Sequence, residues 1–76
     1  MMNFQGEIND TRRLIWQVRS YIGRDLFDKA EEDIRYATVA LDMLARVSNH
    51  IPTEQLIELK ELGEQACDIL MFLNNR

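Results

Sequence analysis

The sequence predicts an all-α fold: a small antiparallel bundle of three long helices, in a single helical domain over residues 1–76. Apolar side chains recur every three or four residues in three segments, which is the spacing of one face of an α-helix. Apolar and polar residues do not alternate over a useful length, so no strand is predicted. One proline and three glycines punctuate the chain. The short loops that they mark favour antiparallel neighbours.

The first helix is predicted from about Thr11 to Ile22. Asn9 or Asp10 is expected to be its N-cap, because a side-chain oxygen there can accept from the free amides of the first turn. Gly23 is expected to end the helix, as glycine often does. The apolar stripe of this segment consists of Ile8, Thr11, Ile15, Val18 and Ile22.

The second helix is predicted from about Leu26 to Val47, with Asp25 as its cap. Its main stripe consists of Ala30, Ile34, Ala37, Leu41 and Leu44. Beyond Tyr36 the polar face narrows, and a second apolar side is formed by Val39, Ala40, Met43 and Val47. This half is therefore expected to be the centre of the bundle, covered by more than one neighbouring helix.

The third helix is predicted from Thr53, as a cap, to about Leu73, after a loop over residues 48–52. Its stripe consists of Leu59, Leu62, Ala66, Ile69 and Leu73. Cys67, the only cysteine, is expected to be a small core residue. Gly63 lies on the apolar side, where it permits close contact or a bend. Such a bend, or a short extra helix over residues 3–9, would raise the number of helices to four or five.

The charge of the chain is negative and unevenly distributed. The net charge of −4 argues against nucleic acid as a partner, because phosphates need a basic footprint. Residues 1–24 carry four arginines and two carboxylates, whereas residues 25–76 carry five basic and eleven acidic groups. Such asymmetry either marks an interaction surface or lets a basic helix pack beside acidic ones.

The expected location follows from two absences in the sequence. Residues 1–7 lack the basic segment and apolar run of a secretory signal. The longest apolar run, from Ile69 to Leu73, is far shorter than the roughly 20 residues that span a bilayer. We expect a cytoplasmic protein on this basis, with peripheral membrane association or a periplasmic location as the alternatives.

No set of residues indicates catalysis, a cofactor or a metal. His50, the only histidine, forms an Arg-x-x-x-His spacing with Arg46, but a loop histidine near a helix C-terminus is the simpler interpretation. The carboxylates of residues 31–33 and 54–61 fall on polar faces without a histidine beside them, so a solvated surface is expected. We therefore predict a protein that is not an enzyme and has no cofactor and no metal site.

Trp16 is the most informative residue of the first helix. At about 100° per residue it lies nearly opposite Leu14, Val18 and Tyr21 on the wheel. The basic residues around it are Arg12, Arg13 and Arg19. A tryptophan ringed by arginines suits a membrane interface or an acidic protein partner, because indole is apolar with a polar edge and arginine stacks on it. We favour the other interpretation, in which residues 3–9 or the third helix cover Trp16.

Phe72 is a second aromatic residue that points away from its helix's apolar stripe. It is either exposed on a frayed end or closes the end of the bundle. We favour closure of the bundle.

The chain as a whole resembles the bacterial PAS factor family, a secretion factor of Vibrio. The features that carry the resemblance are 76 residues, helix throughout, one cysteine and a helix–loop–helix centred on residues 48–53. The resemblance implies a saposin-like fold and a role in releasing periplasmic proteins through contact with lipid. The chain departs from ordinary saposins because it lacks their six cysteines.

Two functions are therefore consistent with the sequence. The first is a saposin-like protein that contacts a membrane lipid surface through Trp16, Arg12, Arg13 and Arg19. The second is a soluble protein–protein interaction module, either a secretion chaperone or a regulatory adaptor. Acidic, heptad-patterned helices in so small a domain also fit a homodimer. The resemblance places the lipid function slightly ahead.

Overall fold

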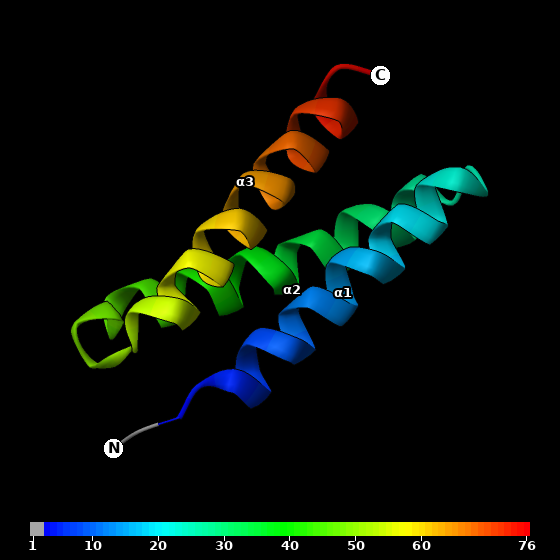
Figure 1. Cartoon of the computed structure of the whole chain (residues 1–76). Coiled ribbons are helices and arrows are strands. Elements are labelled where there is room, and N and C mark those ends of the chain that lie inside the picture. The colour runs from blue at the N-terminus through cyan, green and yellow to red at the C-terminus, as the bar shows by residue number, and fades with distance from the viewer. Residues whose placement is uncertain (1–2) are drawn as a thin grey trace.

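A computed structural model describes residues 3–76, and it is an all-α bundle (Figure 1). The helices are α1 (Gln5–Gly23), α2 (Phe27–Arg46) and α3 (Thr53–Asn74), with a short 3-10 helix η1 (Ser48–His50) before α3. Helix accounts for 86% of the described chain, and residues 3–76 contain no strand. The predicted fold class is confirmed, with three long helices that pack against one another.

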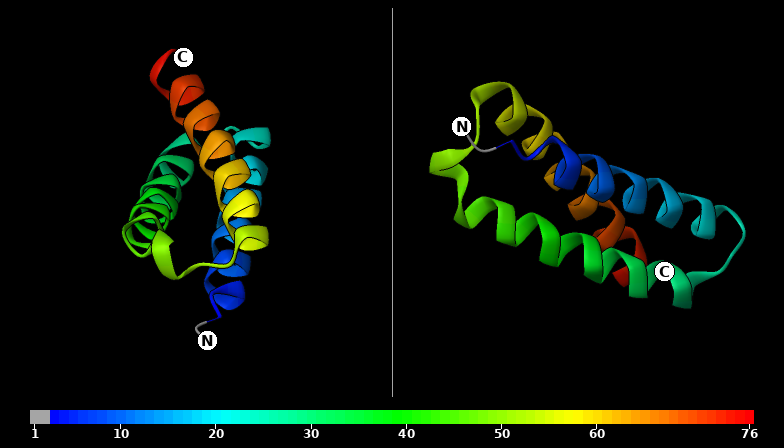
Figure 2. Two further views of the ribbon diagram at one scale, coloured as in Figure 1. Left: turned by 60° about the vertical axis from the view of Figure 1, so that its left-hand side comes forward. Right: turned by 90° about the horizontal axis from the view of Figure 1, so that it is seen from below.

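The three helices run up, down and up. Figure 2 shows the turn between α1 and α2 at one end, with the α2–α3 connection at the other end beside the start of α1. Hence α2 is antiparallel to both of its neighbours. The bundle is elongated, with extents of 41 × 19 × 16 Å. Within residues 3–76, no helix is both long and apolar enough to cross a bilayer.

The core lies along the inner faces of all three helices. Its fully buried members from α1 and α2 include Ile8, Ile15, Val18, Ala30 and Ile34. From α3 the stripe of Leu59, Leu62, Ala66, Ile69 and Leu73 is buried, as predicted. The one buried polar residue of the described chain is Thr11, whose hydroxyl donates to the carbonyl oxygen of Glu7 at 2.9 Å. The predicted stripes therefore form the core.

The start of α1 differs from the prediction. The helix begins at Gln5 rather than at about Thr11, and residues 3–9 do not form a separate short helix. Asn9 and Asp10 are therefore exposed residues inside the helix and not its caps. Ile8 extends the three-four spacing by a turn and is fully buried, so packing favours helix through this segment over an Asn or Asp cap.

The turn between α1 and α2 is built around Asp25. The first helix ends at Gly23 as predicted, but Asp25, with φ of 60°, is the residue in the left-handed region. The amide of Leu26 donates to the carbonyl oxygen of Tyr21 at 2.8 Å, which closes the turn. Asp25 therefore reverses the chain and is not the predicted cap of α2, whose N-cap is Leu26.

α3 continues without a break through Gly63, so the count stays at three long helices. A Cβ atom added at Gly63 would meet no other atom within 4 Å. Neither a bend in α3 nor a close approach of another backbone therefore explains why position 63 is a glycine. Thr53 makes no side-chain cap hydrogen bond, and Pro52 is the N-cap of α3.

Burial is wrongly predicted at three positions, two on α2 and one on α3. Val39 and Met43 on the second apolar side of α2 are 58% and 63% exposed, because α1 and α3 cover only the main stripe. Cys67 is exposed as well. It follows the buried Ala66 by one residue, which turns it about 100° away from the stripe of α3.

Phe72 contacts Phe27 at the end of the bundle but stays exposed, so the predicted closure is only partial. Its ring lies 6.5 Å from that of Phe27, centroid to centroid, and the guanidinium of Arg76 lies 4.6 Å from the Phe27 centroid. Arg76 also pairs with Glu31 on α2. The end of α3 is thereby attached to the start of α2, although Phe72 itself stays half-exposed.

Candidate binding surface on α1

Trp16 is exposed on α1, with 71% of its surface accessible. Neither residues 3–9 nor α3 cover it, so the expectation of a covered tryptophan is wrong. Its neighbours along the chain explain this, because Ile15 and Val18 point into the core and Trp16 follows Ile15 by about 100°. The large apolar side chain of Trp16 is therefore exposed to solvent on the outer face of α1.

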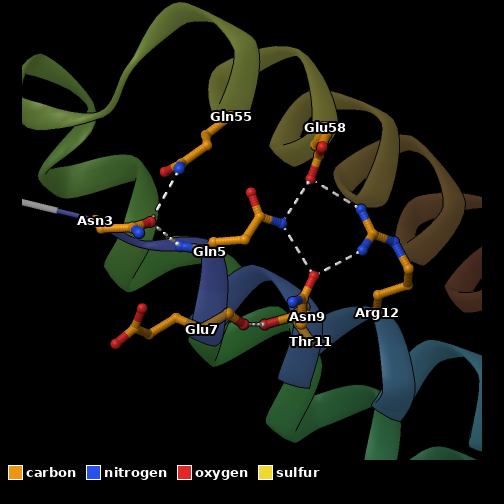
Figure 3. A network of polar contacts seen from close by, with 8 residues as sticks. All are labelled: Asn3, Gln5, Glu7, Asn9, Thr11, Arg12, Gln55 and Glu58. Carbon is orange, nitrogen blue, oxygen red and sulfur yellow. Dashed lines mark hydrogen bonds and ion pairs between the residues drawn. The ribbon is translucent and has the colours of Figure 1, made fainter.

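Arg12 is half-buried and reaches across to α3. Its Nη2 lies 2.9 Å from Oε2 of Glu58, and its Nη1 donates to Oδ1 of Asn9 at 2.9 Å. Gln5 closes a ring, because its Nε2 donates to Asn9 at 3.0 Å and to Glu58 at 3.2 Å (Figure 3). Arg12 thus connects α1 to α3 through an ion pair. Because its guanidinium is engaged by Glu58, it is less available to a ligand than the sequence alone indicates.

The same ring perturbs the carboxylate of Glu58. Hydrogen bonds from Gln5 and then Arg12, with the charge of Arg12, hold the pKa of Glu58 below its ordinary value of 4.5, although burial acts in the opposite direction. The charged form of Glu58 is therefore the one that the folded state favours.

A second set of hydrogen bonds extends this contact toward the N-terminus. Oδ1 of Asn3 accepts from the backbone amide of Gln5 at 2.9 Å and from Nε2 of Gln55 at 3.0 Å. Oε1 of Gln55 in turn accepts from the amide of Phe4 at 3.3 Å. The start of α1 is held on α3 by these side chains, which fixes the helix that carries Trp16.

Arg13 and Arg19 are the freer charges beside Trp16. Arg13 lies 3.8 Å from Asp10, and both side chains are more than three-quarters exposed. Arg19 is exposed and forms no ion pair among residues 3–76. Each arginine is three positions from Trp16, which places one on either side of the indole at about 60°. We call Trp16, Arg13 and Arg19 the α1 surface.

A second exposed apolar surface lies on α2, and sequence reasoning did not identify it as a surface. We call it the α2 strip; it consists of Tyr36, Val39, Ala40, Met43 and Val47. Tyr36 is 61% exposed, close to the values for Val39 and Met43. An apolar groove of about 310 Å³ runs along it, lined by Phe4, Glu7, Ala40, Met43, Leu44 and Val47. The apolar spacing is visible in the sequence. It does not show, however, that α1 and α3 leave this side of α2 uncovered.

The remaining candidates do not form a site. His50 lies in η1 and is exposed. Among residues 3–76, no three histidine, cysteine or acidic side chains are grouped so that they could hold a metal ion. The α1 surface and the α2 strip both expose large apolar side chains that offer contacts to another molecule.

Comparison with known proteins adds no relative. No protein-family model, no curated protein and no solved structure shows significant similarity to the chain. The resemblance to the PAS factor family thus stays an expectation from the sequence.

Proposed function

We propose that this protein is a non-enzymatic, peripheral lipid-binding protein that lays α1 on a membrane surface. In this arrangement Trp16 enters the interface between headgroups and acyl chains, and Arg13 and Arg19 contact lipid phosphates. The observation that carries the proposal is the exposure of Trp16, at 71%, between two exposed arginines on a rigid helix.

The chemistry of the three side chains supports this arrangement. Indole is amphipathic and is enriched at membrane–water interfaces. There its apolar ring contacts lipid while its N–H remains hydrated. Arginine keeps its head in the polar layer while its stem covers apolar surface. Each basic side chain near an anionic bilayer contributes about 1 kcal/mol, so two arginines and one tryptophan give weak, reversible and salt-dependent binding.

The overall charge limits which membranes fit. Because the whole chain carries −4, a strongly anionic surface repels the acidic helix α3 while it attracts the α1 surface. We therefore expect binding to be best on mixed bilayers with a moderate anionic fraction. Promotion of protein release from the periplasm rests on the resemblance to the PAS factor family and is proposed only as a consequence of lipid contact.

Vesicle co-sedimentation tests the proposal. The protein is mixed with phosphatidylcholine vesicles containing phosphatidylglycerol, and the bound fraction is compared for the natural chain, Trp16→Ala and Ile57→Ala. Ile57 is a matched control, because it is 57% exposed on α3. We expect Trp16→Ala to lose most binding and Ile57→Ala to keep it. Equal binding by all three proteins would refute the proposal.

A protein partner is the second candidate function. It is favoured by the engagement of Arg12 with Glu58, which removes one of the charges that anionic lipid would use, and by the net charge of −4. An amphipathic peptide helix would then contact Trp16 through its apolar face, with single carboxylates beside Arg13 and Arg19. Absence of vesicle binding at low salt, together with an accessible Trp16, would favour this interaction module over the lipid function.

A further inference from the structure

We infer that the α2 strip is a self-association surface, on which a second copy of this chain packs its own α2 in the antiparallel direction. The starting observation is that three large side chains of this strip, Tyr36, Val39 and Met43, are each more than half exposed. They lie on one helix and are continuous with an apolar groove.

The strip has the heptad spacing of a helix–helix seam. Positions 29, 32, 36, 39, 43 and 46 follow one another at steps of three and four, as a and d positions do, and all of them lie within α2. Tyr36, Val39 and Met43 are the apolar centre of this seam. Its two ends are charged: Lys29 and Glu32 come before the centre, and Arg46, the last residue of α2, comes after it.

The charges at these ends select the antiparallel direction. A parallel pair would place Glu32 beside Glu32 and Arg46 beside Arg46 of the second copy, which is repulsive. An antiparallel pair centred near residue 41 places Val39 opposite Met43 of the second copy. The same register places Tyr36 opposite Arg46, a cation–π pair, and brings Glu32 to within about one helical turn of Arg46 of the second copy. The sequence of the seam is therefore complementary to itself.

An alternative antiparallel register is disfavoured. Moving the centre of the pair toward the N-terminus by half a heptad places Lys29 opposite Arg46 and Glu32 opposite Met43 of the second copy. That register sets two positive charges against each other and buries a carboxylate against an apolar side chain. The register centred near residue 41 avoids both.

The apolar groove beside the strip fits this arrangement. It is lined on one side by Phe4 and Glu7 of α1 and on the other by Met43 and Val47 of α2. In the register centred near residue 41, Tyr36 of the second copy lies next to Val47, at the edge of the groove. The phenol ring can enter the groove and bury apolar surface on both copies.

The inferred contact leaves the α1 surface free, so it does not depend on the proposed lipid function. Glu7, which lines the groove, and Trp16 are nine residues apart on α1, or about 180° around the helix. A symmetric pair would thus present two Trp16 side chains away from its interface.

The area of the inferred interface limits the expected affinity of the dimer. Stable complexes bury about 800 Å² of each partner, which would be roughly 15% of the 5448 Å² surface of this chain. A contact centred on three large side chains lies at the lower end of this range. We expect a dimer that dissociates at micromolar concentration.

Sedimentation equilibrium over a range from about 1 to 500 μM tests the inference. The natural chain is compared with Val39→Asp and with Ile57→Asp, whose parent side chains are 58% and 57% exposed on different helices. We expect Val39→Asp to raise the dimer dissociation constant by at least about tenfold and Ile57→Asp to leave it nearly unchanged. Far-UV circular dichroism checks that both variants fold.

A charge swap tests the antiparallel register. Glu32→Arg alone and Arg46→Glu alone are each expected to weaken the dimer, whereas the double variant is expected to recover much of the loss, because the two ends then attract again. A natural chain that stays monomeric at all these concentrations would overturn the inference. So would equal weakening by Val39→Asp and Ile57→Asp, or a double variant weaker than either single variant.

Discussion

Replacing Leu44 with alanine tests how much of the stability of the bundle depends on the buried side of α2. Leu44 is 6% exposed, so almost all of its side chain is removed from water in the folded state. The substitution deletes three carbon atoms, which at about 0.8 kcal/mol for each buried methylene is a transfer loss of roughly 2.4 kcal/mol. The cavity left behind adds to this, so the expected loss lies within about 2–5 kcal/mol.

The expected loss is large for this chain. At about 0.05–0.15 kcal/mol per residue, 76 residues have an unfolding free energy of roughly 4–11 kcal/mol. A loss of about 2.4 kcal/mol lowers the melting temperature by roughly 10–20 °C in a domain of this size. The measurement is urea denaturation followed by circular dichroism at 222 nm, at a concentration low enough to keep the protein monomeric.

Leu41→Ala is the matched control, because it makes the same chemical change one turn earlier at a half-buried position. We expect it to cost clearly less than Leu44→Ala. If Leu44→Ala costs under about 1 kcal/mol, or no more than Leu41→Ala, then the account of which side of α2 carries the core is wrong.

Three other predictions concern single positions. Gly63→Ala should raise the unfolding free energy by about 0.5–1 kcal/mol, because the added methyl group meets no atom within 4 Å and the helix gains propensity; a fall would refute this. Glu58→Gln should destabilise the protein at neutral pH. Because the pKa of Glu58 is lowered in the folded state, the difference from the natural chain should shrink as pH falls from the ordinary value of 4.5 through the lower pKa of the folded protein, and a difference that does not change with pH would contradict the assignment. Phe72→Ala should cost about 1–2 kcal/mol through the lost ring contact with Phe27, whereas Met71→Ala, at 58% exposure, should change stability by under about 0.5 kcal/mol; equal effects would show that the ring contact does not matter.

Much of the fold was predictable because the core stripes are regular. The observed α2 starts and ends within one residue of the predicted helix, and α3 begins at Thr53, the residue that was predicted to be its cap. The start of α1 was missed by six residues. Capping preference is worth about 1 kcal/mol, and the complete burial of Ile8 outweighs it.

The surfaces were harder to predict than the core. Sequence periodicity identified the second apolar side of α2, but it could not show that α1 and α3 would leave Val39 and Met43 uncovered. The position of Arg12 beside Glu58 depends on a contact between residues 46 positions apart, which no local pattern encodes. The exposure of Trp16 was one of two alternatives left by the helical wheel, and only the packing of α3 decided between them.

The emission of Trp16 during a vesicle titration tests the proposed lipid contact most directly, because this is the only tryptophan of the chain and reports on that surface alone. We expect the free protein to emit at the long wavelength of a solvent-exposed indole, since Trp16 is 71% exposed, and the emission to shift to the blue as phosphatidylcholine–phosphatidylglycerol vesicles are added. Lipids brominated near the headgroup should quench this emission, and the combined Arg13→Gln and Arg19→Gln variant should need more lipid for the same shift. Emission that stays red and unquenched at saturating lipid would contradict the proposed function.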